Sequence, residues 1–253
     1  MLKEAQTRLR EATRVAVLTG AGISAPSGIP TFRDPGGLWK EFRIEDYATP
    51  EAYARDPERV WAWYAWRYRK IQAARPNRAH ELLARLEAEK GEGFVLVTQN
   101  IDGLHQRAGS RRVIELHGNI ARARCEWCDA RVPLPPPEAF TPPPTCPRCT
   151  SRMRPDVVWF GEFLPEKALA AAERAFAEAE VALVIGTSAA VEPAASLGRY
   201  ARWSGAYLIE INPEPTPLTP LAHCALRMGA VEGLEALLAP PAEDQPEGDL
   251  PKP

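Results

Sequence analysis

The chain has 253 residues, of which 45% are hydrophobic and 25% are charged, and its formal net charge at pH 7 is -2. This composition is typical of a globular protein, and the length allows one large domain with a small insert. The near-neutral charge argues against a nucleic-acid-binding surface that covers the whole protein. Because the sequence has no run of 18 apolar residues and no signal-peptide pattern, we expect a cytoplasmic protein that does not enter a membrane.

A strand followed by a glycine-rich turn is predicted near the N-terminus, after a first helix over residues 1–13. Residues 15–18 are an apolar run long enough for one buried strand. The turn that follows, Gly20 to Ala25, fits the pattern G-x-G-x-x-G/A, in which backbone amides face the phosphates of a dinucleotide. Alone this pattern is weak evidence, because many glycine-rich turns bind nothing. Its Gly- and Pro-rich extension through residues 26–39 predicts a functional loop rather than a flexible insertion.

Residues 50–72 are expected to form a helix crowded with aromatic side chains, most of which we assign to core packing. Tyr64 and Arg67 differ, because at a spacing of three residues they share one face of that helix. A hydroxyl beside a planar guanidinium is suited to binding a carboxylate. The alternative is a surface arginine whose aliphatic stem covers apolar area.

A buried strand at 94–98, which follows an amphipathic helix at 77–89, runs directly into the segment Gln-Asn-Ile-Asp at 99–102. Ligands of open α/β sheets lie beyond the carboxyl ends of the strands, so these polar side chains are site candidates. A further short strand, 113–116, ends at His117. A histidine at a strand end is often structural, but this one follows a second polar cluster, which makes an acid–base role near neutral pH equally reasonable.

Four of the five cysteines form two pairs with the spacing C-x2-C-x17-C-x2-C: Cys125, Cys128, Cys146 and Cys149. This spacing is typical of four-thiolate zinc sites and is the most specific local pattern in the chain. Four thiolates leave no position open for water, so the zinc is expected to be structural. The proline-rich segment between the pairs predicts an exposed loop of a zinc ribbon. Cys224 is interpreted as an ordinary buried thiol.

The second half of the chain continues the alternation of strands and helices. Residues 157–160 are strong strand formers, and an alanine-rich helix is expected over 165–180. A buried strand at 181–185 runs into Gly-Thr-Ser. After a helix at 193–203, a strand at 206–211 runs into Asn-Pro-Glu. Strands that end near residues 19, 98, 116, 185 and 211 predict an α/β fold, a Rossmann-like mostly parallel sheet with helices on both faces, plus a small inserted zinc-ribbon domain.

Taken together, these motifs resemble the sirtuins, the NAD-dependent protein-lysine deacylases. They occur in the family's order between about residues 14 and 230. The matching segments are Gly20 to Ser24, Gly28 to Arg33, Thr98 to Asp102, Leu116 to Gly118, the four paired cysteines, Val158 to Glu162, Gly186 to Ser188, and Asn212-Pro213.

The resemblance implies that NAD is a consumed co-substrate and that one structural Zn²⁺ is bound by the four paired cysteines. The residues that would bind NAD are Gly20, Ala21, Gly22, Ser24, Phe32, Arg33, Gln99, Asn100, Ile101, Asp102, Gly186, Thr187, Ser188, Asn212, Pro213, Glu214 and Ala230. Of these, Phe32 and Arg33 would close over the nicotinamide ribose, and Asp102 would contact the carboxamide.

The resemblance also implies a division of the chain. A Rossmann-like NAD-binding domain would take residues 1–35, 73–120 and 155–240. The helical part of a small domain, with the acyl pocket, would take 36–72, and the zinc-ribbon insert would take 121–154. Residues 241–253 are Pro-rich and acidic, which predicts a disordered tail.

By the same resemblance, His117 and Asn100 are the catalytic residues. Nicotinamide would leave as the acyl oxygen attacks the ribose, and His117 would then act as general base on a ribose hydroxyl. The products implied are nicotinamide, O-acyl-ADP-ribose and deacylated lysine. The partners would be acylated lysine side chains of proteins, whose peptide would pair as an added strand beside Val158, Phe160 and Gly161.

The pair Tyr64 and Arg67 resembles the signature of the sirtuin subgroup that removes succinyl and malonyl groups. Arg67 would pair with the acyl carboxylate, and Tyr64 would add a hydrogen bond. Ala48 matches a small residue that leaves room for a longer acyl chain in that subgroup. The sequence thus predicts a desuccinylase and demalonylase that also retains deacetylase activity.

Three other functions stay open at this point. Mono-ADP-ribosyl transfer to protein would use the same NAD site. A non-enzymatic zinc-ribbon module that binds nucleic acid or protein would explain the cysteines but not Asn100, Asp102 or His117. A redox dehydrogenase is disfavoured, because no clear acidic residue ends a second strand about 20 residues after the glycines.

Overall fold

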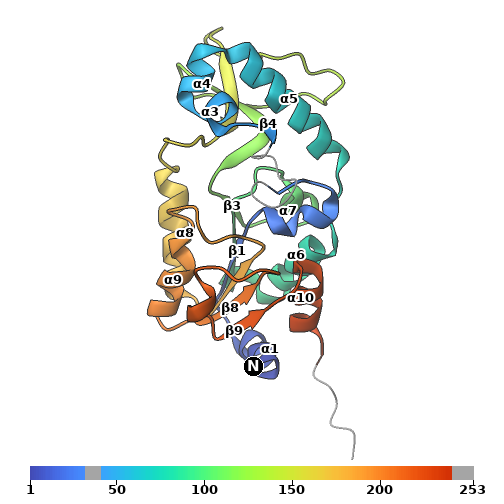
Figure 1. Ribbon diagram of the computed structural model, residues 1–253, viewed down its shortest axis with the longest axis vertical. Coiled ribbons are helices and arrows are strands. Elements are labelled where there is room, and N and C mark those ends of the chain that lie inside the picture. The colour runs from blue at the N-terminus through green and yellow to red at the C-terminus, as the bar shows by residue number, and fades with distance from the viewer. Residues whose placement is uncertain (32–40, 241–253) are drawn as a thin grey trace, which may run out of the picture.

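The computed structural model describes residues 1–31 and 41–240. The expectations about Phe32, Arg33 and the tail at 241–253 lie outside these residues. The chain forms a large part built on a six-stranded sheet and a small part built on a three-stranded sheet, which lie at opposite ends of the molecule (Figure 1).

Every neighbouring pair in the large sheet is parallel, which confirms the predicted fold class. Its order is β3-β2-β1-β7-β8-β9. The strands are β1 (Val15–Thr19), β2 (Phe94–Thr98), β3 (Val113–Glu115), β7 (Val181–Ile185), β8 (Tyr207–Ile211) and β9 (Cys224–Leu226). Every residue of β1, β7 and β8 is buried, because helices cover both faces of the sheet.

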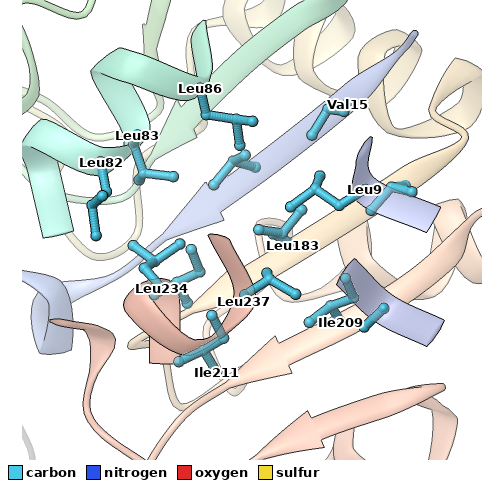
Figure 2. Close-up of a cluster of buried hydrophobic side chains, with 14 of the residues drawn as sticks. Leu9, Val15, Leu82, Leu83, Leu86, Leu183, Ile209, Ile211, Leu234 and Leu237 are labelled. Atoms are coloured by element: carbon cyan, nitrogen blue, oxygen red, sulfur yellow. The ribbon is translucent and has the colours of Figure 1, made fainter. Parts of the chain in front are cut away.

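Helices α1 (Leu2–Glu11), α6 (Arg78–Lys90) and α10 (Ala230–Leu238) pack on one face of the large sheet. Figure 2 shows their leucines, among them Leu9, Leu83 and Leu234, directed at the side chains of β1, β7 and β8. Helices α8 (Glu166–Glu178) and α9 (Ser196–Trp203) cover the other face, where Phe176 is fully buried. A short helix, α7 (Leu104–Arg107), follows the polar segment after β2.

The small part combines a three-stranded antiparallel sheet, of order β5-β4-β6, with three helices. The strands are β4 (Gly118–Cys125), β5 (Arg131–Pro133) and β6 (Met153–Val157), and the helices are α3 (Ile44–Tyr47), α4 (Pro50–Arg55) and α5 (Pro57–Ala73). Tyr53 and the indole of Trp61 both donate to the carbonyl of Met153, at 2.9 and 2.8 Å. These bonds join the helices to the sheet inside an aromatic core.

Two expectations about this region are wrong in detail. The single helix predicted over 50–72 is two helices, because Pro57 starts a new one. Asp56 caps that helix by accepting a hydrogen bond from the amide of Arg59 at 3.0 Å. The strand predicted at 157–160 is also displaced, since β6 ends at Val157 and the residues after it form a loop.

The second sheet extends past the range of 121–154 expected for the zinc-ribbon insert, because β4 begins at Gly118 and β6 ends at Val157. In the large part, β9 and α10 come after the last strand that the sequence pattern predicted. The helix expected from residue 193 begins at Ser196. Short 3-10 helices occupy Ala21–Ile23, Ala25–Ser27, Gly91–Gly93 and Thr219–Leu221.

Among the described residues, no helix has both the length and the apolar character that a membrane span requires.

The buried phenylalanine of α8 provides a test of the packing. Phe176→Ala should lower the free energy of unfolding by about 3–5 kcal/mol, because it leaves a cavity between α8 and the sheet. Phe163→Ala is the matched control, since that ring is 99% exposed and its loss should leave stability nearly unchanged. Urea unfolding followed by circular dichroism measures both, and equal losses would contradict the assignment of Phe176 to the core.

Candidate functional site

The glycine-rich turn after β1 packs directly against the end of β7. The amide of Gly20 donates to the carbonyl of Ile185 at 3.0 Å, and that of Gly22 to the carbonyl of Gly186 at 2.8 Å. A Cβ on Gly22 would lie 2.8 Å from the Cα of Gly186, and one on Gly20 would lie 2.7 Å from the carbonyl oxygen of Gly186. The turn therefore requires glycine at both positions because two backbones meet there.

This geometry refines the expectation that the amides of the turn face a phosphate. The amides of Gly20, Gly22, Ile23 and Ser24 all donate to carbonyl oxygens of the protein. The amide of Ala21 has no carbonyl partner among the described residues. Of the amides from Gly20 to Ser24, that of Ala21 thus remains available for an anion among the described residues.

The polar segment after β2 folds back onto this turn. The hydroxyl of Ser24 donates to Oδ2 of Asp102 at 2.7 Å, and the amide of Leu104 donates to Oδ1 at 2.9 Å. The side-chain amide of Asn100 donates to the carbonyl of Gly20 at 3.0 Å. Ser24, Asn100 and Asp102 are all buried, so the two loops form one hydrogen-bonded unit. Burial raises the pKa of Asp102, and the bonds from Leu104 and Ser24 oppose that rise.

Two buried histidines that sequence reasoning missed lie beneath this unit. The Nε2 of His80 is 3.4 Å from the hydroxyl of Ser24, and the Nε2 of His105 is 2.9 Å from that of Thr19. Their rings meet edge to face, with centroids 4.9 Å apart. Burial lowers the pKa of His80 to about 4 and that of His105 to about 3, so both are neutral at physiological pH. Their positions inside helices gave no local signal, because only the fold brings them to the turn.

His117 lies between the end of β3 and the start of β4, and one residue fixes its ring. Its Nδ1 lies 2.9 Å from the carbonyl oxygen of Gln99. Because a carbonyl can only accept, Nδ1 carries the proton and the neutral ring presents Nε2 as a base. Burial lowers the pKa of His117, and the bond to Gln99 acts in the opposite direction. The side chain of Gln99 donates to Thr187 at 3.0 Å, which joins the loops after β2 and β7.

The residues expected on the adenosine side lie beyond β7 and β8. The side-chain amide of Asn212 donates to the carbonyl of Glu214 at 2.8 Å, which holds that turn. Ser188 and Pro213 are exposed, whereas Ala230 is buried in the first turn of α10. Helix α10 contacts the 3-10 helix at Ala21–Ile23, so this group adjoins the glycine-rich turn.

Tyr64 and Arg67 are both buried on α5, so Arg67 is not the surface residue that the alternative interpretation required. The guanidinium of Arg67 lies 4.7 Å from the ring centre of Trp63 and 5.8 Å from that of Tyr64. Burial lowers the pKa of Arg67, while the nearby Tyr64 and Asp102 raise it. The carboxyl group of Asp102, in the polar segment after β2, thus acts on the charge of Arg67.

The loop after β6 links the two groups of residues. The amide of Val158 donates to the carbonyl of His117, and that of Phe160 to the carbonyl of Ala48, each at 2.9 Å. Ala48 is buried, and Gly161 has a positive φ of 88°, which ends the extended segment in a turn. One loop thus contacts both the residue expected to act as base and the small residue expected in the acyl pocket.

The four paired cysteines come together at the end of the small sheet. Their sulfur atoms all lie within 4.8 Å of one another, with Cys125 3.5 Å from Cys149 and Cys128 3.6 Å from Cys146. A tetrahedral zinc with Zn–S bonds of about 2.3 Å has edges of about 3.8 Å, so the donor set suits a structural Zn²⁺. Cys224 lies apart, buried in β9.

The comparison with known proteins assigns the chain to one family. Residues 20–193 match the family model described as the Sir2 family. The match covers the glycine-rich turn, the polar segment after β2, His117 and the cysteine cluster. The chain belongs to the Sir2 family.

Individual relatives agree with this assignment. The chain is 69% identical over 252 residues to an NAD-dependent protein deacylase of Thermus thermophilus, covering 98% of each chain. The structure of a Sir2 homolog–NAD complex superposes with a TM-score of 0.87 at 47% identity, covering 93% of this chain and 92% of that one. A Sir2 mutant in complex with a deacetylated p53 peptide and 3'-O-acetyl ADP ribose matches with a TM-score of 0.83 at 37% identity, covering 94% and 97%.

The cysteine cluster predicts a defined metal content. Cys149→Ser should lose most of the bound zinc and unfold at a lower temperature, because three thiolates no longer close the tetrahedron. Elemental analysis and thermal unfolding check both effects. Cys224→Ser is the matched control and should keep about one zinc per chain. A Cys149→Ser protein that retains full zinc would contradict the assignment.

Proposed function

We propose that this chain is an NAD-dependent protein-lysine deacylase that prefers succinyl and malonyl groups and also removes acetyl groups. The observation that carries the proposal is the placement of His117. The base nitrogen of this residue is oriented by Gln99, which also contacts the loop after β7. The same histidine is bonded through its carbonyl to the loop beside the acyl pocket. A single group thus adjoins both the proposed dinucleotide and the proposed acyl-lysine.

The residues at the carboxyl edge of the sheet fit NAD. The glycine-rich turn, with the amide of Ala21, would receive its phosphates. The loop containing Asn100 and Asp102 would hold the nicotinamide and its ribose. The turns at Ser188 and Asn212, with the start of α10, would hold the adenosine. Bound NAD supplies the ribose carbon that accepts the acyl oxygen, and the products are nicotinamide, O-acyl-ADP-ribose and deacylated lysine.

His117 would serve as the general base. In the neutral ring Nδ1 donates to Gln99, so Nε2 is the atom that accepts a proton from a ribose hydroxyl. Burial lowers its pKa, which keeps the ring neutral at physiological pH. Asn100, tied to the carbonyl of Gly20, would hold the ribose in place while this proton moves.

The acyl preference rests on Tyr64, Arg67 and Ala48. A buried guanidinium beside a hydroxyl suits the carboxylate that ends a succinyl or malonyl group. Ala48 has a small side chain, which leaves room for the longer acyl chain.

The peptide that carries the lysine would pair as a strand with the loop that contains Val158 and Phe160. We expect this chain to act on acylated proteins in the cytoplasm. We expect no nucleic acid among its partners.

Mono-ADP-ribosyl transfer would use the same NAD site, but relatives named NAD-dependent protein deacylase favour deacylation. Mass spectrometry of the products separates the two activities. Deacylation yields free lysine and O-acyl-ADP-ribose, whereas transfer leaves ADP-ribose on the protein.

The role of His117 is tested by substitution and by pH. His117→Ala should lower kcat/KM about 10²–10⁴-fold, the usual size of a general-base contribution. Because the pKa of His117 is lowered, activity of the wild type should persist at neutral pH and decline only as the pH falls below the ordinary histidine value of about 6.5. His223→Ala, whose ring stacks on Tyr207 at the opposite edge of the sheet, should retain activity. Equal losses in the two variants would contradict the assignment.

The role of Arg67 is tested by comparing acyl groups on one peptide. Arg67→Met should lose desuccinylation, at a cost of about 2–5 kcal/mol in transition-state binding, and keep most deacetylation. Lys70→Met, on the same helix with its amine over the ring of Trp66, is the matched control and should change neither activity. An Arg67→Met protein that loses both activities equally, or neither, would exclude the carboxylate role.

A further inference from the structure

We propose that Trp159 is a positioning residue for the acyl preference. Its indole N–H donates a hydrogen bond to the hydroxyl oxygen of Tyr64 and so directs the hydroxyl proton to the carboxylate of the acyl group. This inference rests on the proposed preference for succinyl and malonyl groups. It adds a residue outside the Tyr64–Arg67 pair and states which atom donates to the ligand.

The hydrogen-bond roles follow from the chemistry of the two side chains. The Nε1 of Trp159 lies 2.9 Å from the hydroxyl oxygen of Tyr64. Indole can only donate, so the tyrosine oxygen must accept. A tyrosine hydroxyl has one proton, and this bond does not use it. Among the described residues, the hydroxyl of Tyr64 has no other hydrogen-bond partner. Its proton is therefore available to an acceptor that enters the pocket.

Trp159 is itself held firmly. The guanidinium of Arg154 lies 3.5 Å from the centre of its ring. That guanidinium also donates to both oxygens of Glu162, at 2.6 and 2.9 Å, in a bidentate pair. Glu162 accepts the backbone amide of Trp159 at 2.8 Å, and the ring of Tyr53 packs on the indole with centroids 5.2 Å apart. Contacts to the backbone amide, to the face of the ring and to the indole N–H thus hold Trp159 in place.

The electrostatics of the pocket agree with a donating hydroxyl. Tyr64 is 3% exposed and Trp159 is 2% exposed, so water does not compete for the bond between them. Burial raises the pKa of Tyr64, and the hydroxyl stays protonated at neutral pH. The positive charge of Arg67 lies 5.8 Å from the same ring. A carboxylate would meet one positive charge and one oriented O–H, whereas an acetyl group would use neither.

A purely structural role of Trp159 predicts a different outcome. If the indole only fills space, Trp159→Phe lowers activity on every acyl group alike, whatever residue stands at position 64. If it acts through the hydroxyl of Tyr64, its effect is confined to acyl groups with a carboxylate and vanishes when that hydroxyl is absent. A double-mutant cycle separates these cases.

The experiment measures kcat/KM on succinyl-lysine and acetyl-lysine in one peptide for the wild type, W159F, Y64F and the double variant. Loss of a hydrogen bond to a charged group should lower the succinyl-to-acetyl ratio about tenfold in Y64F. W159F should lower the ratio about threefold or more, because the hydroxyl loses its fixed direction. The double variant should match Y64F, since Trp159 has no hydroxyl to act through.

Trp61→Phe is the matched control. Its indole also donates a hydrogen bond of 2.8 Å inside the same aromatic core, but to the carbonyl of Met153. This variant should keep the wild-type ratio. Additive effects of W159F and Y64F, an unchanged ratio in W159F, or an equal fall in W61F would each overturn the inference.

A second measurement needs no change at Trp159 and applies even where W159F does not fold. In protein labelled with ¹⁵N-tryptophan, Y64F should shift one indole N–H signal. In the wild type the succinyl peptide should shift the same signal further than the acetyl peptide does, whereas in Y64F the two peptides should shift it equally. The absence of either shift would overturn the inference.

A wild type with a low succinyl-to-acetyl ratio refutes the proposed acyl preference and this inference with it. A high ratio that W159F leaves unchanged refutes the inference alone.

Discussion

The parallel pairing of β1 with β2 on one side and β7 on the other is the constraint on which the site depends. Thr19 lies opposite Thr98 and Ile185, so all three strands end at the same level. The loops that follow must then share a small volume. They do so by bonding to one another, as Ser24 does to Asp102. Each loop is thus bonded to the other two, through Ser24 and Asp102, Gln99 and Thr187, and Gly22 and Gly186.

The large sheet and the cysteine cluster were predictable from the sequence, because the patterns that indicate them lie in short segments of the chain. Five of the six strands of the large sheet are short apolar runs that end at polar or glycine residues, and helices alternate with them. The spacing of the cysteines predicts their cluster, because two C-x2-C pairs suit one tetrahedral ion. The sixth strand, β9, has only three residues and escaped notice, since so short a segment has no periodicity to detect.

The features that the sequence did not predict depend on contacts between residues that are far apart in the chain. Nothing near His80 or His105 indicates that both would lie under the glycine-rich turn. The bond from Trp159 to Tyr64 spans 95 positions, and only the packing of β6 against α5 creates it. The strand predicted at 157–160 failed for the same reason. Its apolar residues have high strand propensity, but their amides bond to the carbonyls of His117 and Ala48 and to the side chain of Glu162.

The loop after β6 has a mechanical consequence. Two of its amides, at Val158 and Phe160, bond to carbonyls that belong to His117 and to Ala48. Between them stands Trp159, whose side chain bonds to Tyr64. These three bonds act as a bracket that keeps the histidine and the pocket at a constant separation. Because the ring of His117 is also bonded to Gln99 at the end of β2, the same bracket sets the position of the pocket relative to the edge of the large sheet.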